Sequence, residues 1–353
     1  MTDLEFMQRA LSLAERGSGK VSPNPAVGAV LVKDGKIVGE GFHQYEQRLH
    51  AEVIACEQAG EAASRATLYV NLEPCAHQGR TPPCCDYLAA KKIGRVVSAM
   101  QDPNPLVSGR GFERLRQAGI AVEVGVLGAE AAALNEAYTK FICERIPFVT
   151  IKTAMSLDGK ITSARRQGRE LFTGPESNAV TEKLRLQADA IAVGSASVLT
   201  DDPLLTYRGP EKRRRPLVRV LLDPHGRVGL DRRLFEEPPP IWWVRPPLQL
   251  SLPDNITLIH PESGHAETWR RVLQRMTEEG MYHLLIEGGG ETNASALGAG
   301  IVDKLLFAYT PKILGGRTTI GPVGGEGFCP PLEVNSMTAE RIGSDIWIHA
   351  YLR

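Results

Sequence analysis

The amino-acid sequence predicts an α/β protein of two domains. Its 353 residues exceed the usual length of a single domain. Short apolar runs alternate with helix-like segments along the whole chain, which is typical of α/β layers. The alternation is interrupted by "CERIP" at residues 143–147 and begins afresh with "FVTIKTAM". We therefore expect the boundary near residue 146, with domains over residues 1–145 and 146–353.

The first domain opens with a helix and a hairpin. Residues 3–16 carry an uneven apolar face of helical spacing. In "AVGAVLVKDGKIVGEGFH" two apolar runs flank Asp34-Gly35, a typical hairpin turn. Further helices are expected over residues 51–59, 83–94, 109–118 and 129–140, and strands over 66–74, 95–100 and 120–127.

A second series of strands and helices fills the other domain. "ADAIAVGSASVLT" predicts a strand that leads into a helix or a loop, and "HLLIEGGGETNASALGAG" predicts a strand, a glycine turn and a helix. "KLLFAYTPKIL" (residues 304–314) is expected to close the series. Other strands are expected over residues 148–155, 217–224 and 241–244.

Charge and composition limit the function classes. Lysine plus arginine and aspartate plus glutamate both number 41, so the formal net charge is zero. Proteins that bind nucleic acid or membrane surfaces usually carry a basic excess, so neither partner is expected. No apolar stretch reaches the roughly 20 residues that span a bilayer, and the start of the chain lacks the pattern of a signal peptide. We expect a cytoplasmic enzyme that acts on a small molecule.

Two short segments together match a zinc-deaminase signature. Three of the six cysteines lie between residues 75 and 85, which in a reducing compartment favours metal binding over disulfides. In the signature, H-x-E supplies a metal ligand and a proton-shuttling glutamate, and P-C opens a segment with two cysteine ligands. Residues 50–52 (H-A-E) and 74–75 (P-C) match. Cys84 follows after eight residues rather than two, and Cys85 beside it is an equal candidate for the third ligand.

Each half of this signature also has an ordinary explanation. H-x-E recurs by chance, and loop cysteines are often small buried hydrophobic residues. The order of features favours a metal site: a hairpin, H-A-E at a helix start, a strand, E-P-C, and a cysteine at the next helix start. An alternative of another class is a structural zinc module without catalysis, with Cys85 as the fourth ligand that closes such sites.

These residues also carry a resemblance. "NPAVGAV", "HAE", "LEPCAHQGRTPPCC" and "QDPNPLVSGRG" resemble the bacterial bifunctional riboflavin-biosynthesis deaminase–reductases, whose own signature has a similar long loop between the cysteines. The resemblance implies a cytidine-deaminase-like three-layer fold for the first domain. It also implies that His50, Cys75 and Cys84 hold one zinc ion, that Glu52 is the catalytic proton shuttle, and that Cys85 is a bystander.

The same resemblance implies substrate contacts in the first domain at Asn24, His43, His77, Arg80, Asp102 and Asn104. Amide and imidazole groups suit the edge of a pyrimidine, and Arg80 suits a 5′-phosphate. For Asn24 and Asn104 the alternative is turn formation beside proline, which Asn-Pro usually indicates.

A glycine turn, Gly288–Gly290, is the main feature of the second domain. Bare amides at a helix N-terminus bind phosphates, although the turn alone is weak support for a nucleotide. "KTAMSLDGKI", "AVGSASVLTDDPLLTYR" and "LIEGGGETNASAL" resemble the reductase half of the same family, whose fold is similar to dihydrofolate reductase. The resemblance implies NADPH contacts at Ala154, Ser197, Asp201, Gly289, Gly290, Glu291, Thr292, Asn293, Ala294 and Ser295. It implies substrate contacts at Lys152, Arg185, Leu205, Arg208 and Glu287.

Two segments of the second domain have an alternative interpretation, and a third differs from the sequence pattern of the family. Asp201 and Asp202 could instead cap a turn. "GRELFTG" (residues 168–174) is one residue shorter than the family's stretch and lacks its serine and tryptophan, which leaves Phe172 and Thr173 for that part of the pocket. The basic run "EKRRRP" (residues 211–216) suggests a 2′-phosphate site, but we expect a solvated loop.

The resemblance thus implies a two-step enzyme. The first domain would deaminate 2,5-diamino-6-ribosylamino-4(3H)-pyrimidinone 5′-phosphate hydrolytically with zinc, and the second would reduce its ribosyl group to ribityl with NADPH. The alternative is a zinc deaminase of nucleosides or tRNA with an unrelated C-terminal domain. We expect a homo-oligomer, either a dimer or a tetramer.

Overall fold

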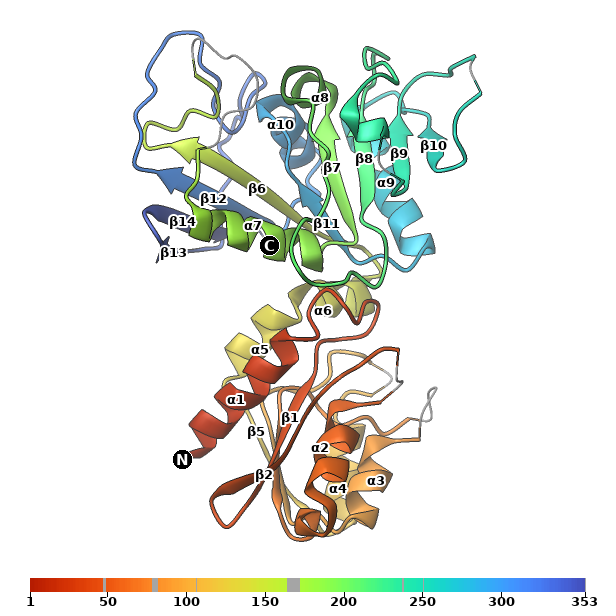
Figure 1. Ribbon diagram of the computed structural model, residues 1–353, viewed down its shortest axis with the longest axis vertical. Helices are drawn as coiled ribbons and strands as arrows, with labels where there is room; N and C mark the ends of the chain where they lie inside the picture. Colours follow the sequence, from red (N-terminus) through yellow and green to blue (C-terminus); the bar gives the residue numbers. More distant parts are fainter. Residues whose placement is uncertain are drawn as a thin grey trace. The chain divides into compact units, whose positions relative to one another are not determined.

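The chain folds into two compact units, Met1–Arg145 and Ile146–Arg353 (Figure 1). The computed structural model describes residues 1–46, 49–77, 82–105, 107–163, 172–236, 238–249 and 251–352. Each unit has its own β-sheet, and the two are described in turn.

The first unit is built on a five-stranded mixed sheet. Its elements are α1 (Asp3–Glu15), β1 (Gly28–Lys33), β2 (Lys36–Phe42), α2 (Ala51–Ala59), the short 3₁₀ helix η1 (Gly60–Ala63), β3 (Thr67–Val70), α3 (Cys84–Ala90), β4 (Arg95–Ser98), α4 (Arg110–Gln117), β5 (Ala121–Val124), α5 (Gly128–Leu134) and α6 (Glu136–Glu144). The strand order is β2-β1-β3-β4-β5. β1 is antiparallel to β2 and β3, and β3, β4 and β5 are parallel. The expected hairpin is the pair β1–β2.

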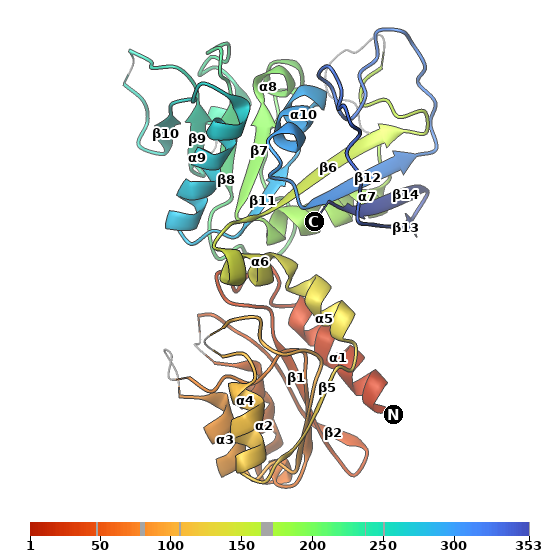
Figure 2. The same ribbon diagram turned by 180° about the vertical axis from the view of Figure 1, so that it is seen from behind.

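Helices cover both faces of this sheet and make three layers. α1 and α5 lie on one face, and α2, α3 and α4 on the other (Figures 1 and 2). Each face has its own apolar core, because successive residues of a strand point to opposite sides. On β1, Val30 packs with Met7 of α1, whereas Leu31 packs with Ala55 of α2 and Leu88 of α3. The sheet is therefore buried on both faces.

One expected helix is in fact two. The segment predicted over residues 129–140 divides into α5 and α6 at Asn135, where φ is −112° and ψ is 21°. The buried Asn135 amide accepts a hydrogen bond from Ala26 N (2.8 Å) and donates one to Ala26 O (3.0 Å). Asparagine side chains that bond to backbone groups compete with the helix in this way. The break anchors the loop before β1, which carries Asn24.

The second unit is built on a nine-stranded sheet. Its elements are β6 (Phe148–Ser156), α7 (Pro175–Gln187), β7 (Ala190–Gly194), α8 (Ser195–Asp201), β8 (Val218–Leu222), the 3₁₀ helix η2 (Arg233–Phe235), β9 (Ile241–Val244), β10 (Ile256–Ile259), α9 (His265–Glu278), β11 (His283–Ile286), α10 (Gly290–Gly298), β12 (Lys304–Thr310), β13 (Ser336–Ile342) and β14 (Asp345–Tyr351). The strand order is β10-β9-β8-β7-β11-β6-β12-β14-β13, and the strands from β10 to β12 are all parallel.

The expectation that residues 304–314 close the series is wrong. Two further strands, β13 and β14, form an antiparallel hairpin that pairs with β12. β13 is exposed along most of its length, which its mixed polar sequence "SMTAERI" matches. Trp347 of β14 is fully buried and donates a hydrogen bond from Nε1 to Ser177 Oγ of α7 (2.9 Å). The hairpin thus extends the sheet and fastens α7 to it.

Two apolar cores cover the two faces of the parallel part of the sheet. Trp269 and Met276 of α9 and Ala296 of α10 belong to one core. Val198 of α8 and Trp243 of β9 belong to the other. In such sheets ligands bind where the carboxyl ends of the strands open into loops. Here those ends lead into α8 after β7 and into the glycine turn after β11.

The basic run at residues 211–216 is a loop, as expected, with Glu211, Lys212 and Pro216 exposed, but its arginines are not fully solvated. Arg213 is partly buried and donates hydrogen bonds to Arg185 O, to Leu186 O (2.8 Å) and to Ala188 O (2.6 Å), at the carboxyl end of α7. Burial lowers its pKa. Arg215 donates to Gly280 O (3.0 Å), just beyond α9. These arginines satisfy carbonyl groups at helix ends, which a helix leaves without partners.

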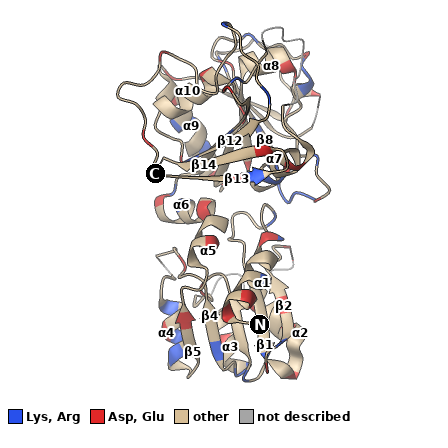
Figure 3. Ribbon diagram, turned by 90° about the vertical axis from the view of Figure 1, so that its left-hand side faces the viewer, with Lys and Arg blue, Asp and Glu red and all other residues tan. Residues whose placement is uncertain are grey.

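Acidic and basic residues are interspersed over both units (Figure 3). This mixture agrees with the zero net charge of the chain. Within the described residues, no helix has the length and apolar character needed to cross a membrane.

Candidate functional site

Three metal-ligating side chains converge in the first unit. His50 directly precedes α2, Cys75 lies in the loop after β3, and Cys84 is the first residue of α3. His50 Nδ1 lies 2.9 Å from Cys84 Sγ and 3.6 Å from Cys75 Sγ. The Cys84 backbone N–H donates a hydrogen bond to Cys75 Sγ (3.3 Å). All three ligand atoms lie within 4.8 Å of one another.

This donor set fits a zinc ion. Zinc binds thiolate sulfur at about 2.3 Å and imidazole nitrogen at about 2.0–2.1 Å, so its ligands must lie within a few ångströms of one another. Hydrogen bonds with Cys84 and His50 lower the pKa of Cys75 to about 4, so this thiol is ionised at neutral pH, the form that binds metal. The hydrogen bond with Cys75 raises the pKa of His50 to about 9, and hydrogen bonding with Cys75 and burial raise the pKa of Cys84.

Cys85 points away from the cluster. Its thiol donates to Pro74 O (3.2 Å) and to Gly111 O (3.4 Å), and it is 1 % exposed. Burial raises its pKa well above the usual range, which keeps the thiol neutral. The geometry thus distinguishes two neighbouring cysteines that the sequence left equal.

Glu52 lies beside the three ligands. It occupies the first turn of α2, is 4 % exposed, and lines the same cavity as His50 and Cys75. Burial raises its pKa. A carboxyl group with a raised pKa holds a proton more readily than an exposed one, which suits a general acid–base group.

The cavity beside this cluster has a volume of about 380 Å³. Five expected substrate contacts line it: Asn24, His43, His77, Asp102 and Asn104. The sixth, Arg80, lies outside the described residues. Tyr45, Tyr138 and Ile142 also line the cavity, and the sequence offered no signal for them because they come from a loop and from α6.

Hydrogen bonds hold the polar groups of this wall in place. Asn24 Nδ2 lies 3.0 Å from His43 Nε2, and His43 Nδ1 lies 2.9 Å from Leu49 O. Burial lowers the pKa of His43, so its ring is neutral at pH 7. Burial also raises the pKa of Asp102 to about 6. Asp102 Oδ1 accepts from the backbone N–H of Asn104 (2.9 Å), so the turn expected at this asparagine is present and its residue still lines the cavity.

Glu73 is a residue whose importance the sequence did not reveal. Its carboxylate is 3 % exposed and accepts four backbone N–H bonds. Oε2 accepts from Asp102 (3.1 Å) and Gly109 (2.9 Å), and Oε1 from Gly111 (2.7 Å) and Phe112 (3.3 Å). A Cβ at Gly111 would lie 2.1 Å from Pro74 O, so only glycine allows this approach. The E-P-C motif therefore also binds the start of α4 to the metal-ligand loop.

A second cavity, of about 260 Å³, opens in the second unit. Nine expected cofactor and substrate contacts line it: Lys152, Ala154, Arg185, Ser197, Asp201, Leu205, Arg208, Glu287 and Gly289. The wall thus combines residues from β6, α7, α8, the segment after α8 and the turn after β11. Asp202, which we expected either to contact a ligand or to cap a turn, accepts the backbone N–H of Arg233 through Oδ1 (3.0 Å).

The remaining expected cofactor contacts, Gly290 to Ser295, form the first turns of α10 and do not line this cavity. Asn293 is fully buried and donates to Thr153 Oγ1 (3.1 Å) and Pro322 O (2.7 Å). Ser295 Oγ accepts from Trp269 Nε1 (3.0 Å). Both side chains hold the helix in position. At the start of the same helix, the Gly324 N–H donates to Gly290 O (2.9 Å).

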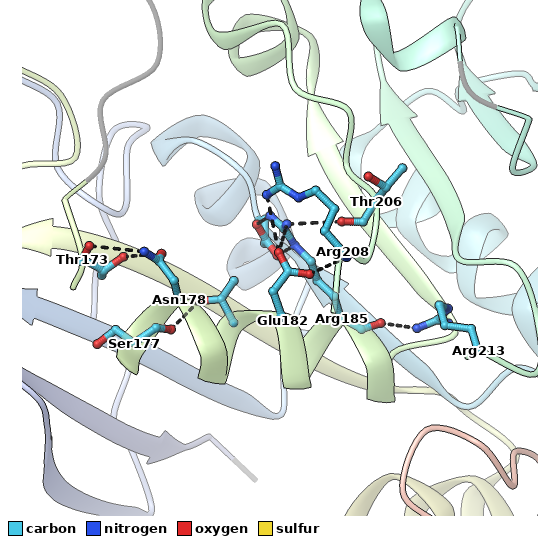
Figure 4. Close-up of polar contacts among 10 residues, drawn as sticks. Thr173, Ser177, Asn178, Glu182, Arg185, Thr206, Arg208 and Arg213 are labelled. Atoms are coloured by element: carbon cyan, nitrogen blue, oxygen red, sulfur yellow. Dashed lines mark hydrogen bonds and ion pairs between the residues drawn. The ribbon is translucent and has the colours of Figure 1, made fainter. Parts of the chain in front are cut away.

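Arg185 and Arg208 converge on Glu182 of α7 (Figure 4). Arg185 binds Glu287 through two bonds, Nε to Oε1 (2.8 Å) and Nη2 to Oε2 (2.7 Å). Its Nη1 also donates to Glu182 Oε1 (3.0 Å). The neighbouring carboxylates raise the pKa of Arg185 further, so it is always charged. Glu182, which the sequence did not single out, is therefore part of this site.

Residues 168–174 form the segment that differs from the family's sequence pattern, and the structure describes this segment only from Phe172 onward. Thr173 Oγ1 donates to Asn178 Oδ1 (2.9 Å), and Phe172 O accepts from Lys312 Nζ (2.9 Å). Neither Phe172 nor Thr173 lines the described cavity.

Comparison with known proteins identifies both units. Residues 147–348 match the RibD C-terminal domain family, and residues 1–100 match the cytidine and deoxycytidylate deaminase zinc-binding region. The chain is similar to the riboflavin biosynthesis protein RibD of Aquifex aeolicus, with 41% identity over 98% of this chain and 97% of that protein. It is similar to RibD of Escherichia coli, with 39% identity over 99% of both chains.

Solved structures agree. RibD of Acinetobacter baumannii (form 1) superposes with a TM-score of 0.83 at 33% identity, over 99% of this chain and 98% of that one. A Thermotoga maritima protein described as a diaminohydroxyphosphoribosylaminopyrimidine deaminase/5-amino-6-(5-phosphoribosylamino)uracil reductase superposes with a TM-score of 0.86 at 34% identity, with the same coverage. The expected fold classes, a cytidine-deaminase-like and a dihydrofolate-reductase-like domain, are confirmed.

We predict that Glu73→Gln loosens the first unit and weakens its hold on zinc. An amide NH₂ would face two backbone N–H donors in place of an acceptor, and a buried polar group without a partner costs about 1–3 kcal/mol. The measurements are urea unfolding and the zinc content of the purified protein. Glu113→Gln, on the exposed side of α4, is the matched control and should change neither. Equal behaviour of the two variants would contradict the role of Glu73.

Proposed function

The chain belongs to the RibD family of riboflavin biosynthesis proteins, and we propose that its two cavities divide the family's two reactions between them. It is a bifunctional deaminase and reductase with zinc and NADPH as cofactors. The observation that carries the proposal is the convergence of His50, Cys75, Cys84 and Glu52 in a cavity lined by amide and imidazole groups.

In the first domain, we assign His50, Cys75 and Cys84 as the zinc ligands. Zinc, when bound, supplies Lewis-acid activation of water at neutral pH. Glu52 would take the proton from that water and deliver it to the departing 2-amino group, because its carboxyl is buried beside the ligands and can hold a proton. Ammonia is then the leaving group.

The polar wall of the same cavity would bind the pyrimidine. Asn24 and Asn104 offer amide donors and acceptors, and the neutral ring of His43 offers one of each. His77 and Asp102 line the cavity with them, and Arg80 is the expected cation for the 5′-phosphate. The substrate would be 2,5-diamino-6-ribosylamino-4(3H)-pyrimidinone 5′-phosphate.

In the second domain, the cavity would hold NADPH and the deaminated product together. NADPH, when bound, supplies the hydride that reduces the ribosyl group to ribityl. Ala154, Ser197 and Asp201 would line the cofactor together with residues 289–295, of which the first turn of α10, before Asn293, would present its backbone N–H groups to the cofactor phosphates. Lys152, Arg185, Leu205, Arg208 and Glu287 would form the substrate side.

Two alternative functions, a zinc deaminase with an unrelated C-terminal domain and a structural zinc module, are less consistent with these observations. An unrelated C-terminal domain is not favoured, because residues 147–348 match the RibD C-terminal domain family. A closed four-ligand zinc module would need Cys85, whose thiol is directed at two backbone carbonyls. A homo-oligomeric state and a cytoplasmic location stay predictions from the sequence.

The experiment that tests the function separates the two steps. We predict that purified protein releases ammonia from the diaminopyrimidine substrate without NADPH, and consumes NADPH only when deamination has occurred. Product identification by mass spectrometry checks both steps. NADPH oxidation with the undeaminated substrate at an equal rate would contradict the proposed order.

We predict that Cys84→Ser removes most of the zinc and Cys85→Ser leaves it in place. The two thiols are neighbours on α3, but only Cys84 Sγ lies within reach of His50 Nδ1. Zinc per chain, measured by atomic emission, is the readout. Similar losses in both variants would show that the ligand assignment is wrong.

We predict that Glu52→Gln abolishes deamination while zinc and reduction are retained. The amide keeps the size of the side chain but carries no proton, and general acid–base catalysis is typically worth about 10²–10⁴-fold. Ammonia release, zinc content and NADPH oxidation with the deaminated compound are the three measurements. Glu57→Gln, on an exposed position of the same helix, is the control. Retained deamination, or loss of both activities in a folded, zinc-loaded variant, would contradict the proposal that the two reactions occur at separate sites.

A further inference from the structure

The reductase cavity contains fewer available positive charges than its arginines suggest. Arg185 is held by Glu287 and Glu182, and Arg208 is also held by Glu182, whose Oε2 accepts its backbone N–H (2.8 Å) and whose Oε1 lies 3.4 Å from its Nη2 (Figure 4). Two arginines therefore face two glutamates, and this group has no net charge. A phosphate monoester carries about −1.5 to −2 charges at neutral pH and needs cations that are not already balanced.

Arg233 supplies such a charge. It lines the same cavity as Arg208, and its side chain is exposed. Among the described ion pairs none joins it to an acidic side chain. Four cations of the wall (Lys152, Arg185, Arg208 and Arg233) and four carboxylates (Asp201, Asp202, Glu287 and the neighbouring Glu182) are equal in number. Arg233 therefore differs from Arg185 and Arg208 by its lack of a described ion pair, not by an excess of charge.

The backbone of Arg233 is held in place from two sides. Its N–H donates to Asp202 Oδ1 (3.0 Å). The next residue, Leu234, is fully buried, and its carbonyl accepts from Arg219 Nη1 (2.6 Å). Arg219 is itself fully buried, and the same Nη1 lies 3.4 Å from Leu204 O. A buried guanidinium on β8 thus joins η2 to the segment that leads to Arg208.

That segment is held in an unfavourable conformation. Asp202 and Leu205 have positive φ values of 43° and 52°, which non-glycine residues rarely adopt. Such conformations cost of order 1–3 kcal/mol each and persist when surrounding contacts impose them, most often at ligand sites. Here the contacts of Asp202 with Arg233 and of Leu204 with Arg219 flank the strained positions. These contacts hold the wall between Arg208 and Arg233.

We propose that Arg233 and Arg208 form the phosphate-binding pair of the reductase cavity, and that Arg185 is a positioning residue. This rests on the proposed function of the second domain. Arg208 is 46 % exposed and its guanidinium has one 3.4 Å contact with Glu182, whereas Arg185 is 9 % exposed and paired with both Glu287 and Glu182. Guanidinium groups bind phosphate oxygens through paired N–H bonds, so two of them suit a phosphorylated sugar. The cofactor also carries phosphates, but the start of α10 offers backbone N–H groups for those. We assign the pair to the substrate.

The test measures binding to the full chain by calorimetry, with ribose 5-phosphate, ribose and NADPH as probes. Arg233→Gln should weaken ribose 5-phosphate binding by about 10–100-fold, the usual worth of a hydrogen bond to a charged group. Ribose and NADPH should bind as to the parent protein, and ammonia release should not change. Arg233→Lys should recover part of the loss. Arg232→Gln is the matched control, because Arg232 is the preceding residue and does not line the cavity.

Three outcomes would overturn the proposal. Weaker NADPH binding with unchanged ribose 5-phosphate binding would assign Arg233 to the cofactor. Unchanged binding of all three probes would make Arg233 an ordinary surface residue. Equal loss of all three, with a lower unfolding temperature, would show a purely structural role. Failure of the parent protein to oxidise NADPH with the deaminated substrate would instead refute the proposed function, independently of Arg233.

Discussion

The Glu73 carboxylate accepts four backbone N–H bonds, two at each oxygen, and these join three segments of the first domain at one buried point. The first segment carries Glu73 and, two residues later, Cys75. The second segment carries Asp102, and the third is the start of α4. A buried carboxylate is tolerated only when hydrogen bonds balance it, and here four N–H groups do so, three of them from the N-terminus of α4. The relative positions of the proposed metal ligands and of the cavity wall beside them depend on this balance.

In the second domain, buried arginines hold loop segments together as Glu73 does in the first. Arg219 is fully buried, and it bonds to backbone carbonyls from the segment after α8, from η2 and from Pro239. Arg213 does the same at the end of α7. Arginine suits this task because its planar group offers five donors in fixed directions. Loops that have no regular hydrogen bonding of their own thereby become a rigid cavity wall.

Each cavity is lined by residues of one domain alone. The deaminase cavity uses residues from Pro23 to Ile142, and the reductase cavity uses residues from Lys152 to Gly289. The two chemistries also need different environments. A buried carboxyl beside the proposed zinc ligands suits proton transfer, whereas a cavity with arginines suits a phosphorylated substrate. Separate cavities allow both in one chain.

Local sequence features predicted most of the regular structure. The hairpin turn at Asp34-Gly35, the helix at residues 51–59 and six of the strands of the second domain follow from spacing and turn chemistry, which act over a few residues. The helices α7 and α9, the strand β10, the break at Asn135 and the added β13–β14 hairpin were not predicted. The break depends on Ala26, more than a hundred residues away, and the hairpin on pairing with β12 and burial of Trp347.

The sequence by itself determined which residue types the sites contain. H-A-E, E-P-C and the glycine turn have the chemistry of a zinc deaminase and a phosphate site before any fold is known. Only the tertiary structure showed that the Cys84 thiol faces His50 while the Cys85 thiol faces two carbonyl groups, revealed the four bonds to Glu73, and brought Arg233 to the cavity of Arg208. The reason is physical: residue identity sets what a side chain can do, whereas long-range packing sets which partners it reaches and whether its charge is already balanced.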